Sequence, residues 1–209
     1  KSIITGAAAF TMITFENFGA FQGSEMLLFT LRNNSGAYVE LTNYGAAIVS
    51  IVVPDKNGKP GNVVLGFDEP EGYLDDACYI GSPIRRFANR IANARFKLNG
   101  KECQLDANDN GNSNHSGNSG YNHRVFNHEI GEAILVFKLT SADGDGGFPG
   151  TLDLQVVYEW TNDNQLKITY LAETDKPTIA NFTNHAYFNL SGEAGSMLEH
   201  RLTINAHNI

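Results

Sequence analysis

The sequence predicts a mainly β protein with antiparallel pairing, and three observations favour this class. Leu152–Trp160 alternates apolar and polar residues, and after a turn Gln165–Ala172 continues the alternation, as in two antiparallel strands that share one buried face. Asn99-Gly100 separates two short β-rich runs, and both central positions of a type I′ hairpin turn require a positive φ. No segment of helical length shows a 3.6-residue apolar period.

The other strands are predicted in chain order from about Phe29 onward, where β-branched and aromatic runs alternate with turn residues. Turns at Asn33–Gly36 and Asp55–Gly58 separate the first of these runs. The expected strands are Tyr38–Tyr44, Ala46–Val53, Arg95–Leu98, Cys103–Leu105, Ala133–Thr140, Leu152–Trp160, Gln165–Ala172 and Arg201–Asn205. The 21 glycines against 6 prolines, with 13 phenylalanines and 8 tyrosines, fit such a strand-and-turn protein.

Two long polar loops interrupt the predicted strands. Asp106–Gly120 consists almost entirely of Asn, Asp, Gly and Ser, with His115 inside it. Ser141–Gly150 is rich in glycine and acidic residues. Each loop is either a flexible surface excursion or a binding loop, since compact β-domains tend to carry their binding groups on long loops.

Length and charge limit the classes of function. The 209 residues allow one sizeable core or two small ones. A net charge of −8 without a dense Lys/Arg block argues against nucleic acid as a partner. Residues 1–10 are apolar but too short to span a bilayer, and no other apolar run approaches that length, so no membrane partner is expected. Part of the segment 1–25 fits a remnant of processing or cloning.

The stretch Asn181–Leu190, with His185 at its centre, carries the strongest indication of chemistry. As a strand it would have two faces, one with His185, Tyr187 and Asn189 and the other with Asn184, Ala186, Phe188 and Leu190. An imidazole that titrates near neutrality among amides and an aromatic ring suits proton transfer to a polar substrate. A core histidine satisfied by its neighbouring amides is the alternative.

Three further residues are candidates for binding or proton transfer. Asn89-Arg90 offers an amide beside a planar guanidinium fork, which suits sugar or carboxylate oxygens; solvated charge at a strand edge is the alternative. His115 has almost no apolar neighbours in sequence, so it is either a binding group or a solvated loop histidine. The spacing of His115, His123 and His128 fits no compact ligand motif, so no metal is expected.

These groups together favour one class of ligand. The sequence contains no G-x-S-x-G elbow, no C-x-x-C pair and no Gly-rich phosphate motif. Histidines, amides, an arginine, acids and aromatic rings on a β scaffold suit a polyhydroxylated ligand, because its hydroxyls need hydrogen-bond partners and its C–H faces stack on rings. The catalysis that such a set offers is proton transfer.

Five segments, in order along the chain, resemble the aldose 1-epimerase (galactose mutarotase) family. They are Leu41–Asp68 and the runs FANRIANARFKLNGK, NSNHSG, DGDGGFPG and NFTNHAYFNLSG. The resemblance implies a large antiparallel β-sandwich with an open cleft, formed by residues 1–209 as one domain that lacks its C-terminal strands. It also implies an isomerase that interconverts the α and β anomers of free hexoses such as galactose and glucose, with no cofactor and no metal.

The resemblance assigns roles to the candidate residues. His185 matches the family histidine that protonates the ring oxygen as the sugar ring opens, and His115 matches the second active-site histidine, which hydrogen-bonds the sugar. Asn89 and Arg90 match the substrate-binding Asn-Arg pair. A monosaccharide is therefore the expected partner. The cytoplasm is the expected compartment, with the periplasm or secretion as the alternative.

Some features depart from the family pattern. Glycine is usual at the position of Arg85, Gly-Gly usually follows the second histidine where Ser116 begins a Ser-Gly pair, and glutamate is common at Gly146. Family members also continue well beyond the equivalent of Ile209, and that part carries the general-base glutamate and a sugar-binding aspartate. Neither Glu193 nor Glu199 has the sequence surroundings of these acids. The base is therefore expected from a segment absent here or from a second chain.

Three alternatives to the epimerase remain open. A carbohydrate-binding module would use the same groups without proton transfer. A larger sugar-active enzyme can borrow this sandwich as one of its parts. A hexose-6-phosphate 1-epimerase would need additional basic residues at the cleft, which Arg85 and Arg86 could provide.

Overall fold

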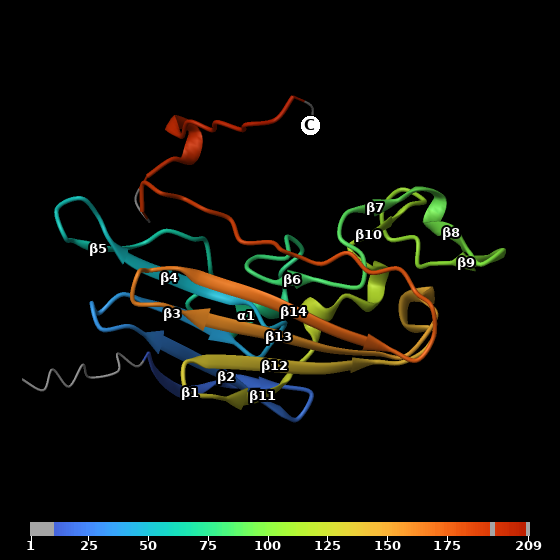
Figure 1. Cartoon of the computed structure of the whole chain (residues 1–209), viewed down its shortest axis with the longest axis horizontal. Helices are drawn as coiled ribbons and strands as arrows, with labels where there is room; N and C mark the ends of the chain where they lie inside the picture. Colours follow the sequence, from blue (N-terminus) through green and yellow to red (C-terminus); the bar gives the residue numbers. More distant parts are fainter. Residues whose placement is uncertain (1–10, 193–194, 208–209) are drawn as a thin grey trace, which may run out of the picture.

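Two antiparallel sheets make up most of the computed structural model, which describes residues 11–192 and 195–207 (Figure 1). The first sheet has the order β1-β2-β3-β4-β5 and the second the order β11-β12-β13-β14. The bounds in the first sheet are β1 Met12–Phe21, β2 Ser24–Arg32, β3 Tyr38–Thr42, β4 Ile48–Pro54 and β5 Pro60–Asn62. Those in the second are β11 Asn127–Ile130, β12 Ile134–Ser141, β13 Leu152–Trp160 and β14 Leu166–Thr174. The predicted mainly β, antiparallel class is confirmed.

Three short strand pairs lie outside the two main sheets in the described part of the chain. The pairs are β6 (Pro83–Ile84) with β15 (Thr183–Asn184), β7 (Arg90–Ile91) with β10 (Ser113–Asn114), and β8 (Arg95–Leu98) with β9 (Lys101–Gln104). In the described part of the chain the one α-helix is α1, Pro70–Leu74. Single 3₁₀ turns lie at Ala92–Ala94, Gly117–Ser119, Tyr121–His123, Asp145–Gly147 and Met197–Glu199. In Figure 1 the pairs β7–β10 and β8–β9 stand together at one end of the molecule.

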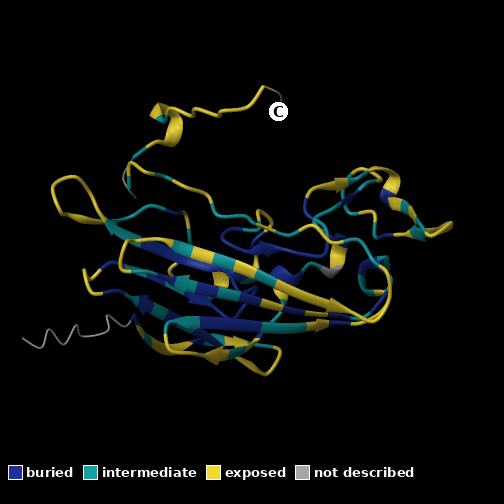
Figure 2. Cartoon of the chain, in the orientation of Figure 1, coloured by how far each residue is buried: buried dark blue, intermediate teal, exposed yellow. Residues whose placement is uncertain are grey.

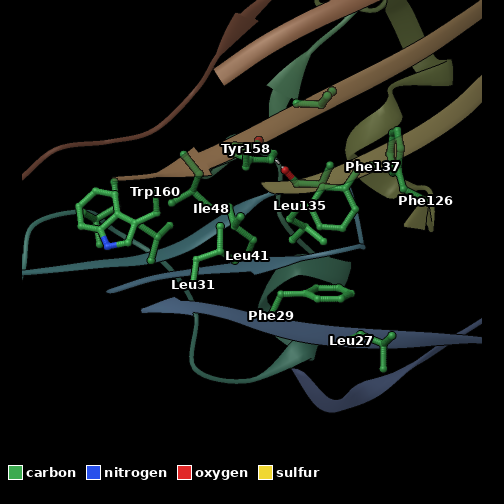
Figure 3. Packing of buried hydrophobic residues seen from close by; sticks show 14 of the residues in the cluster. Leu27, Phe29, Leu31, Leu41, Ile48, Phe126, Leu135, Phe137, Tyr158 and Trp160 are labelled. Atoms are coloured by element: carbon green, nitrogen blue, oxygen red, sulfur yellow. Dashed lines mark hydrogen bonds between the residues drawn. The ribbon is translucent and has the colours of Figure 1, made fainter. Parts of the chain in front are cut away.

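The core lies between the two sheets and fixes them face to face. Phe29, Leu31 and Leu41 of the first sheet pack toward Phe137 and Tyr158 of the second (Figure 3). Figure 2 shows that buried residues concentrate between the sheets. Burial of each large apolar side chain there contributes about 1.5–3 kcal/mol to stability. Two hydrogen bonds also cross the core. The Tyr158 hydroxyl donates to the Ala46 carbonyl at 2.8 Å, and Trp160 Nε1 donates to the Ala37 carbonyl at 3.1 Å.

Several strands follow the sequence closely. Strand β13 has the predicted bounds, and its alternating positions Leu152, Leu154, Val156, Tyr158 and Trp160 are all buried. Strand β8 also has the predicted bounds, and Asn99 and Gly100 in the turn after it have φ values of 50° and 79°. A type I′ hairpin needs this left-handed backbone at both positions.

Three expectations about strands are wrong. Regular strands begin at Met12 and not at about Phe29. Strand β1 is an edge strand whose buried and exposed residues do not alternate regularly, so its sequence does not indicate a strand. Residues 201–206 form no strand; their side chains are exposed and no neighbouring strand in the described chain pairs with them. Within Asn181–Leu190 only Thr183–Asn184 is paired in a strand. Its partner β6 is two residues long and contains Pro83, which has no N–H to extend the ladder.

The expected alternation around His185 survives without a long strand. Asn184, Ala186 and Phe188 line an apolar groove together with residues of β4 and β14, whereas the rings of His185 and Tyr187 lie together, with centroids 5.1 Å apart. Extended backbone, rather than sheet pairing, is sufficient to separate the two sets of side chains. Within the described residues, no helix has both the length and the apolar character needed to cross a bilayer.

Candidate active site

His115 and His185, from distant parts of the chain, meet in space. Their ring centroids are 5.3 Å apart and the rings are nearly perpendicular, at 89°. His115 directly follows β10, and His185 directly follows β15. The His185 amide donates to the Ser82 carbonyl at 2.9 Å, and its own carbonyl accepts from the Gly81 amide at 3.3 Å. Each histidine is thus fixed by the end of a short strand pair.

The pairing of β7 with β10 brings Asn89 and Arg90 to the same place. Arg90 lies opposite Asn114 in this pair, and the Asn89 backbone N–H donates to His115 Nδ1 at 3.1 Å. Arg90 Nε donates to Asp109 Oδ2 at 2.6 Å, and Arg90 Nη1 is 3.4 Å from Asn89 Oδ1. All four residues singled out in the sequence therefore lie in one cluster.

The surroundings of His115 define its protonation state. Because Nδ1 accepts the Asn89 N–H, the proton of the neutral ring lies on Nε2, which is left to donate to a ligand. Burial, followed by the nearby His185 and Arg90, lowers the pKa of His115 below its ordinary value of 6.5. His115 is thus a neutral hydrogen-bond donor near neutral pH, which suits contact with a sugar oxygen.

Two tyrosines complete an aromatic wall around the histidines. The Tyr79 ring centroid lies 4.9 Å from that of His115 and 5.9 Å from that of His185. Tyr187 contacts the other side of His185, and its hydroxyl donates to the Cys78 carbonyl at 3.1 Å. Alternation had placed Tyr187 on the His185 face, but nothing in the sequence around Tyr79 indicates its position.

Left-handed backbone conformations cluster at this site. Tyr79, Asn89, His115 and Ser116 have φ values of 58°, 68°, 51° and 73°. Such conformations are costly for residues other than glycine and persist where the surrounding structure enforces them, often at functional sites. They also explain why no periodic pattern of residues indicates the path of these loops.

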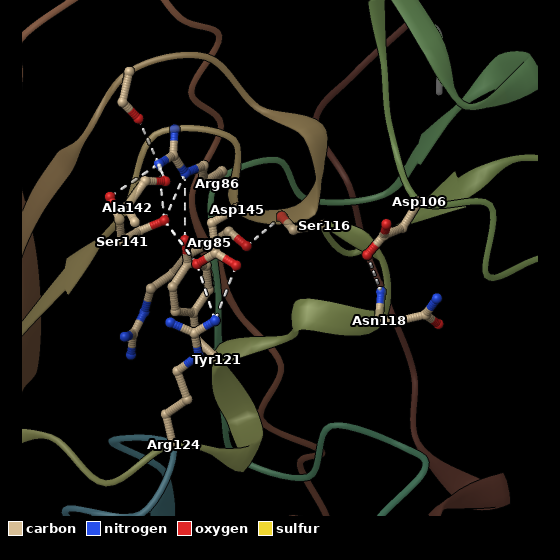
Figure 4. Close-up of polar contacts among 11 residues, drawn as sticks. Arg85, Arg86, Asp106, Ser116, Asn118, Tyr121, Arg124, Ser141, Ala142 and Asp145 are labelled. Carbon is tan, nitrogen blue, oxygen red and sulfur yellow. Dashed lines mark hydrogen bonds and ion pairs between the residues drawn. The ribbon is translucent and has the colours of Figure 1, made fainter.

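A polar network next to His115 connects Ser116 and the loop Ser141–Gly150 to the rest of the protein (Figure 4). The Ser116 hydroxyl donates to the Arg85 carbonyl and accepts from the Phe87 amide, at 2.9 Å for the second contact. Next to it, Asp145 accepts both a bidentate contact from Arg124, at 2.9 and 3.0 Å, and a hydrogen bond from Ser141. The glycine-rich loop Ser141–Gly150 is therefore tied to the protein rather than loose.

Gly146, one of the departures from the family pattern, lies where this loop touches the His115 loop. It has a φ of 61°, and a Cβ at this position would lie 2.8 Å from the Ser116 carbonyl oxygen. The Gly146 carbonyl accepts the Asp106 amide at 3.2 Å. Glycine at this position permits direct backbone packing that a side chain would prevent.

Arg85 and Arg86 do not provide the basic cleft that a phosphorylated sugar would need, because both side chains are buried. Arg86 donates to the Ser141 hydroxyl and to the carbonyls of residues 141, 142, 149 and 150. The Arg85 guanidinium carbon lies 4.2 Å from the centroid of the Phe126 ring, and burial lowers the pKa of Arg85 to about 10. The hexose-6-phosphate alternative thus loses the residues on which it depended.

Two acidic side chains near the aromatic wall already have partners. Asp76 accepts backbone N–H groups, and Asp109 pairs with Arg90. Glu199 is exposed in the last 3₁₀ turn, and Glu193 lies outside the described residues. Across residues 11–192 and 195–207, no group of three or more His, Cys, Asp or Glu side chains is arranged to hold a metal ion.

Fold and site together define a β-sandwich protein with a histidine pair suited to proton transfer on a small polar ligand. A family model described as aldose 1-epimerase matches residues 27–209. The aldose 1-epimerase of Escherichia coli K12 is 41% identical over 187 residues, covering 88% of this chain and 54% of the relative. The human galactose mutarotase is 38% identical over 169 residues, covering 80% of this chain and 49% of the relative. The chain belongs to the aldose 1-epimerase family.

Solved structures agree with this assignment. The galactose 1-epimerase of Lactobacillus acidophilus superposes with a TM-score of 0.77 at 30% identity, covering 86% of this chain and 54% of that one. An aldose epimerase homologue from C. elegans superposes with a TM-score of 0.73 at 34% identity. The chain spans about half the length of the curated relatives it matches.

Proposed function

We propose that this chain carries the histidine half of an aldose 1-epimerase, an isomerase that interconverts the α and β anomers of a free hexose such as galactose or glucose. The perpendicular contact of His115 and His185 beside Asn89-Arg90 is the observation that carries the proposal. The names of the relatives, aldose 1-epimerase and galactose mutarotase, support the same reaction.

In the proposed mechanism a base removes the proton of the C1 hydroxyl while His185 gives a proton to the ring oxygen. The bond from C1 to the ring oxygen breaks, and C1 becomes an aldehyde carbon. After rotation about the C1–C2 bond, the reverse proton transfers close the ring on the opposite face. Both protons return to their donors, so the cycle needs no cofactor.

The other residues bind and orient the sugar in this proposal. Neutral His115 donates its Nε2 proton to a sugar oxygen, and the Asn89 amide and the Arg90 guanidinium bind hydroxyls at the same edge. The base comes from outside these 209 residues, either from a further segment or from a second chain. A monosaccharide-metabolising enzyme of this kind is proposed to work in the cytoplasm.

Polarimetry on freshly dissolved α-D-galactose and α-D-glucose tests the proposal, with this chain alone and with any co-purifying polypeptide. In samples that include the polypeptide supplying the base, we expect mutarotation faster than in buffer, and a loss of about 10²–10⁴-fold in His185→Gln, the range that a positioned general acid contributes. His128→Gln is the matched control, because this half-buried histidine of β11 packs on the ring of Phe29, with centroids 4.9 Å apart, and not on the histidine pair. A rate equal to that of buffer in every sample, with sugar binding that survives His185→Ala in calorimetry, would identify a binding module instead.

A further inference from the structure

The segment Asp76–Gly81 holds a tyrosine in a conformation that the residue does not favour by itself. Tyr79 has a φ of 58°, and a bulky side chain in the left-handed region is a conformational outlier. The Tyr79 carbonyl accepts the Ser82 amide at 3.1 Å, which closes the turn behind it. Some other group must stabilise this turn, since the residue opposes it.

Asp76 is that group. Its Oδ1 accepts the Cys78 amide at 2.7 Å and its Oδ2 accepts the Ile80 amide at 2.6 Å. The two hydrogen bonds lie on either side of Tyr79, and the Asp76 side chain is buried with 8% of the residue exposed. A carboxylate that accepts two backbone N–H groups in a buried position fixes the backbone between them.

The fixed turn contacts both histidines. The Tyr79 ring packs edge-on against His115, at an interplanar angle of 65°, and tilted against His185, at 40°. One residue earlier, the Cys78 carbonyl accepts the hydroxyl of Tyr187, whose ring packs on His185. Two residues later, the Gly81 amide donates to the His185 carbonyl.

His185 depends on these contacts for its orientation. Its imidazole makes no hydrogen bond to another part of the described chain, whereas His115 is held through Nδ1. Packing of Tyr79, His115 and Tyr187 is what limits rotation of the His185 ring. The Tyr79 hydroxyl has no hydrogen-bond partner among the described residues, so the aromatic ring is the part of Tyr79 that these contacts use.

We propose that Tyr79 is a positioning residue for the histidine pair, and that Asp76 acts through Tyr79 by holding its backbone in the left-handed conformation. The catalytic side of this inference rests on the proposed epimerase function; the geometric side does not. An acid that is displaced by about 1 Å loses on the order of 10²-fold in rate. The role of Tyr79 is therefore expected in kcat rather than in sugar affinity.

Tyr79→Leu and Tyr79→Phe test the proposal in the full chain, with Phe21→Leu as the control for loss of a half-buried ring. We expect Tyr79→Leu to lower kcat about 10- to 100-fold with KM within about threefold, and Tyr79→Phe to recover the rate to within about threefold. Asp76→Asn keeps one acceptor oxygen, and its kcat is expected to lie between those of Tyr79→Leu and Tyr79→Phe. A Tyr79→Leu variant that raises KM and keeps kcat would make the ring a sugar-stacking surface and overturn the proposal.

A second measurement is independent of activity. We expect imidazole NMR titration to show the pKa of His115 rising toward 6.5 in Tyr79→Leu, because burial is the main cause of its lowering, and to show no such rise in Tyr79→Phe or Phe21→Leu. An unchanged titration in Tyr79→Leu would overturn the positioning role. If the wild-type protein shows no mutarotation even together with a polypeptide that supplies the base, the proposed function fails, and the titration still decides whether Tyr79 holds the histidines.

Discussion

Asn89 and His115 hydrogen-bond to each other twice. The Asn89 amide donates to His115 Nδ1 at 3.1 Å, and the His115 amide donates to the Asn89 carbonyl at 3.2 Å. The ring of one residue and the backbone of both are thereby fixed in a single unit. Because His185 lies against the same ring, it contributes, after burial, to lowering the pKa of His115.

Stability should depend on pH through His115. Its pKa is lowered in the fold by burial, His185 and Arg90, so near its ordinary pKa of 6.5 the unfolded chain binds more protons than the folded protein. The free energy of unfolding is then expected to fall as the pH decreases below about 6.5 and to be insensitive to this group above it. Urea unfolding between pH 8 and 5 measures the effect. The free energy of unfolding should change less with pH in His115→Gln than in the wild type. An equal pH dependence in the two proteins would contradict a lowered pKa of His115 in the folded state.

Substitutions at Asn89 should separate its backbone role from its side-chain role. With a φ of 68°, Asn89→Ala is expected to lose about 1–2 kcal/mol of stability, whereas Asn89→Gly tolerates the conformation. Both variants lack the amide side chain proposed to bind sugar, so both should bind galactose more weakly to a similar degree. Thermal unfolding and calorimetry distinguish the two effects. Equal stability of the two variants would show that the conformation is not costly here.

Arg86 should be essential for stability although its guanidinium hydrogen-bonds to loop groups and not to the histidine pair. Arg86→Met leaves the Ser141 hydroxyl and several buried carbonyls without their donor, and each buried unsatisfied group costs about 1–3 kcal/mol. A loss of more than about 3 kcal/mol in the free energy of unfolding is expected from chemical denaturation. Arg95→Met is the control, since Arg95 is exposed and its nearest carboxylate contact is 4.0 Å long; its effect should stay within about 0.5 kcal/mol.

Two glycines of the glycine-rich loop Ser141–Gly150 should lose different amounts of stability when they are replaced by alanine. A Cβ on Gly147 would lie 2.0 Å from the Gln104 carbonyl oxygen, whereas one on Gly144 would meet nothing within 4 Å, and both residues have a φ of 86°. Gly144→Ala is expected to lose about 1 kcal/mol for the backbone conformation alone, and Gly147→Ala clearly more because a backbone must move. Similar melting temperatures for the two variants would contradict the close packing.

The parts of the fold that follow local rules could be predicted from the sequence. Alternation in Leu152–Trp160 and the Asn99-Gly100 turn depend on residues that are neighbours in the chain, and both were right. The segment Asn181–Leu190 also has a strand pattern, but pairing requires a partner, and β6 offers only two residues. An alternating pattern can be read from one segment alone, whereas formation of a sheet also requires a second segment of sufficient length to pair with it.

The site was predictable only where a motif carried it. The sequence singled out four residues, and the structure brings them together. Tyr79 was missed because its position depends on a left-handed turn held by Asp76, and no periodic pattern encodes such a turn. Asp109 was missed because its pairing with Arg90 depends on the path of a loop without periodicity. The burial of Arg85 and Arg86, which the hexose-6-phosphate alternative needed at the cleft, was not indicated by the sequence, since charged residues are usually exposed.

The hydrogen bonds of Arg86 to the loop Ser141–Gly150, called here the Arg86 clamp, also constrain the order in which the protein folds during synthesis. Its guanidinium binds groups 55 to 64 positions further along the chain, and contacts of such separation form slowly because a long loop must first close. On the ribosome, the clamp cannot close until Gly150 has emerged, and His185 emerges later still. During synthesis the support for His115 and the partner ring at His185 therefore arrive at different times, and the histidine pair is assembled only when the last of these segments leaves the exit tunnel.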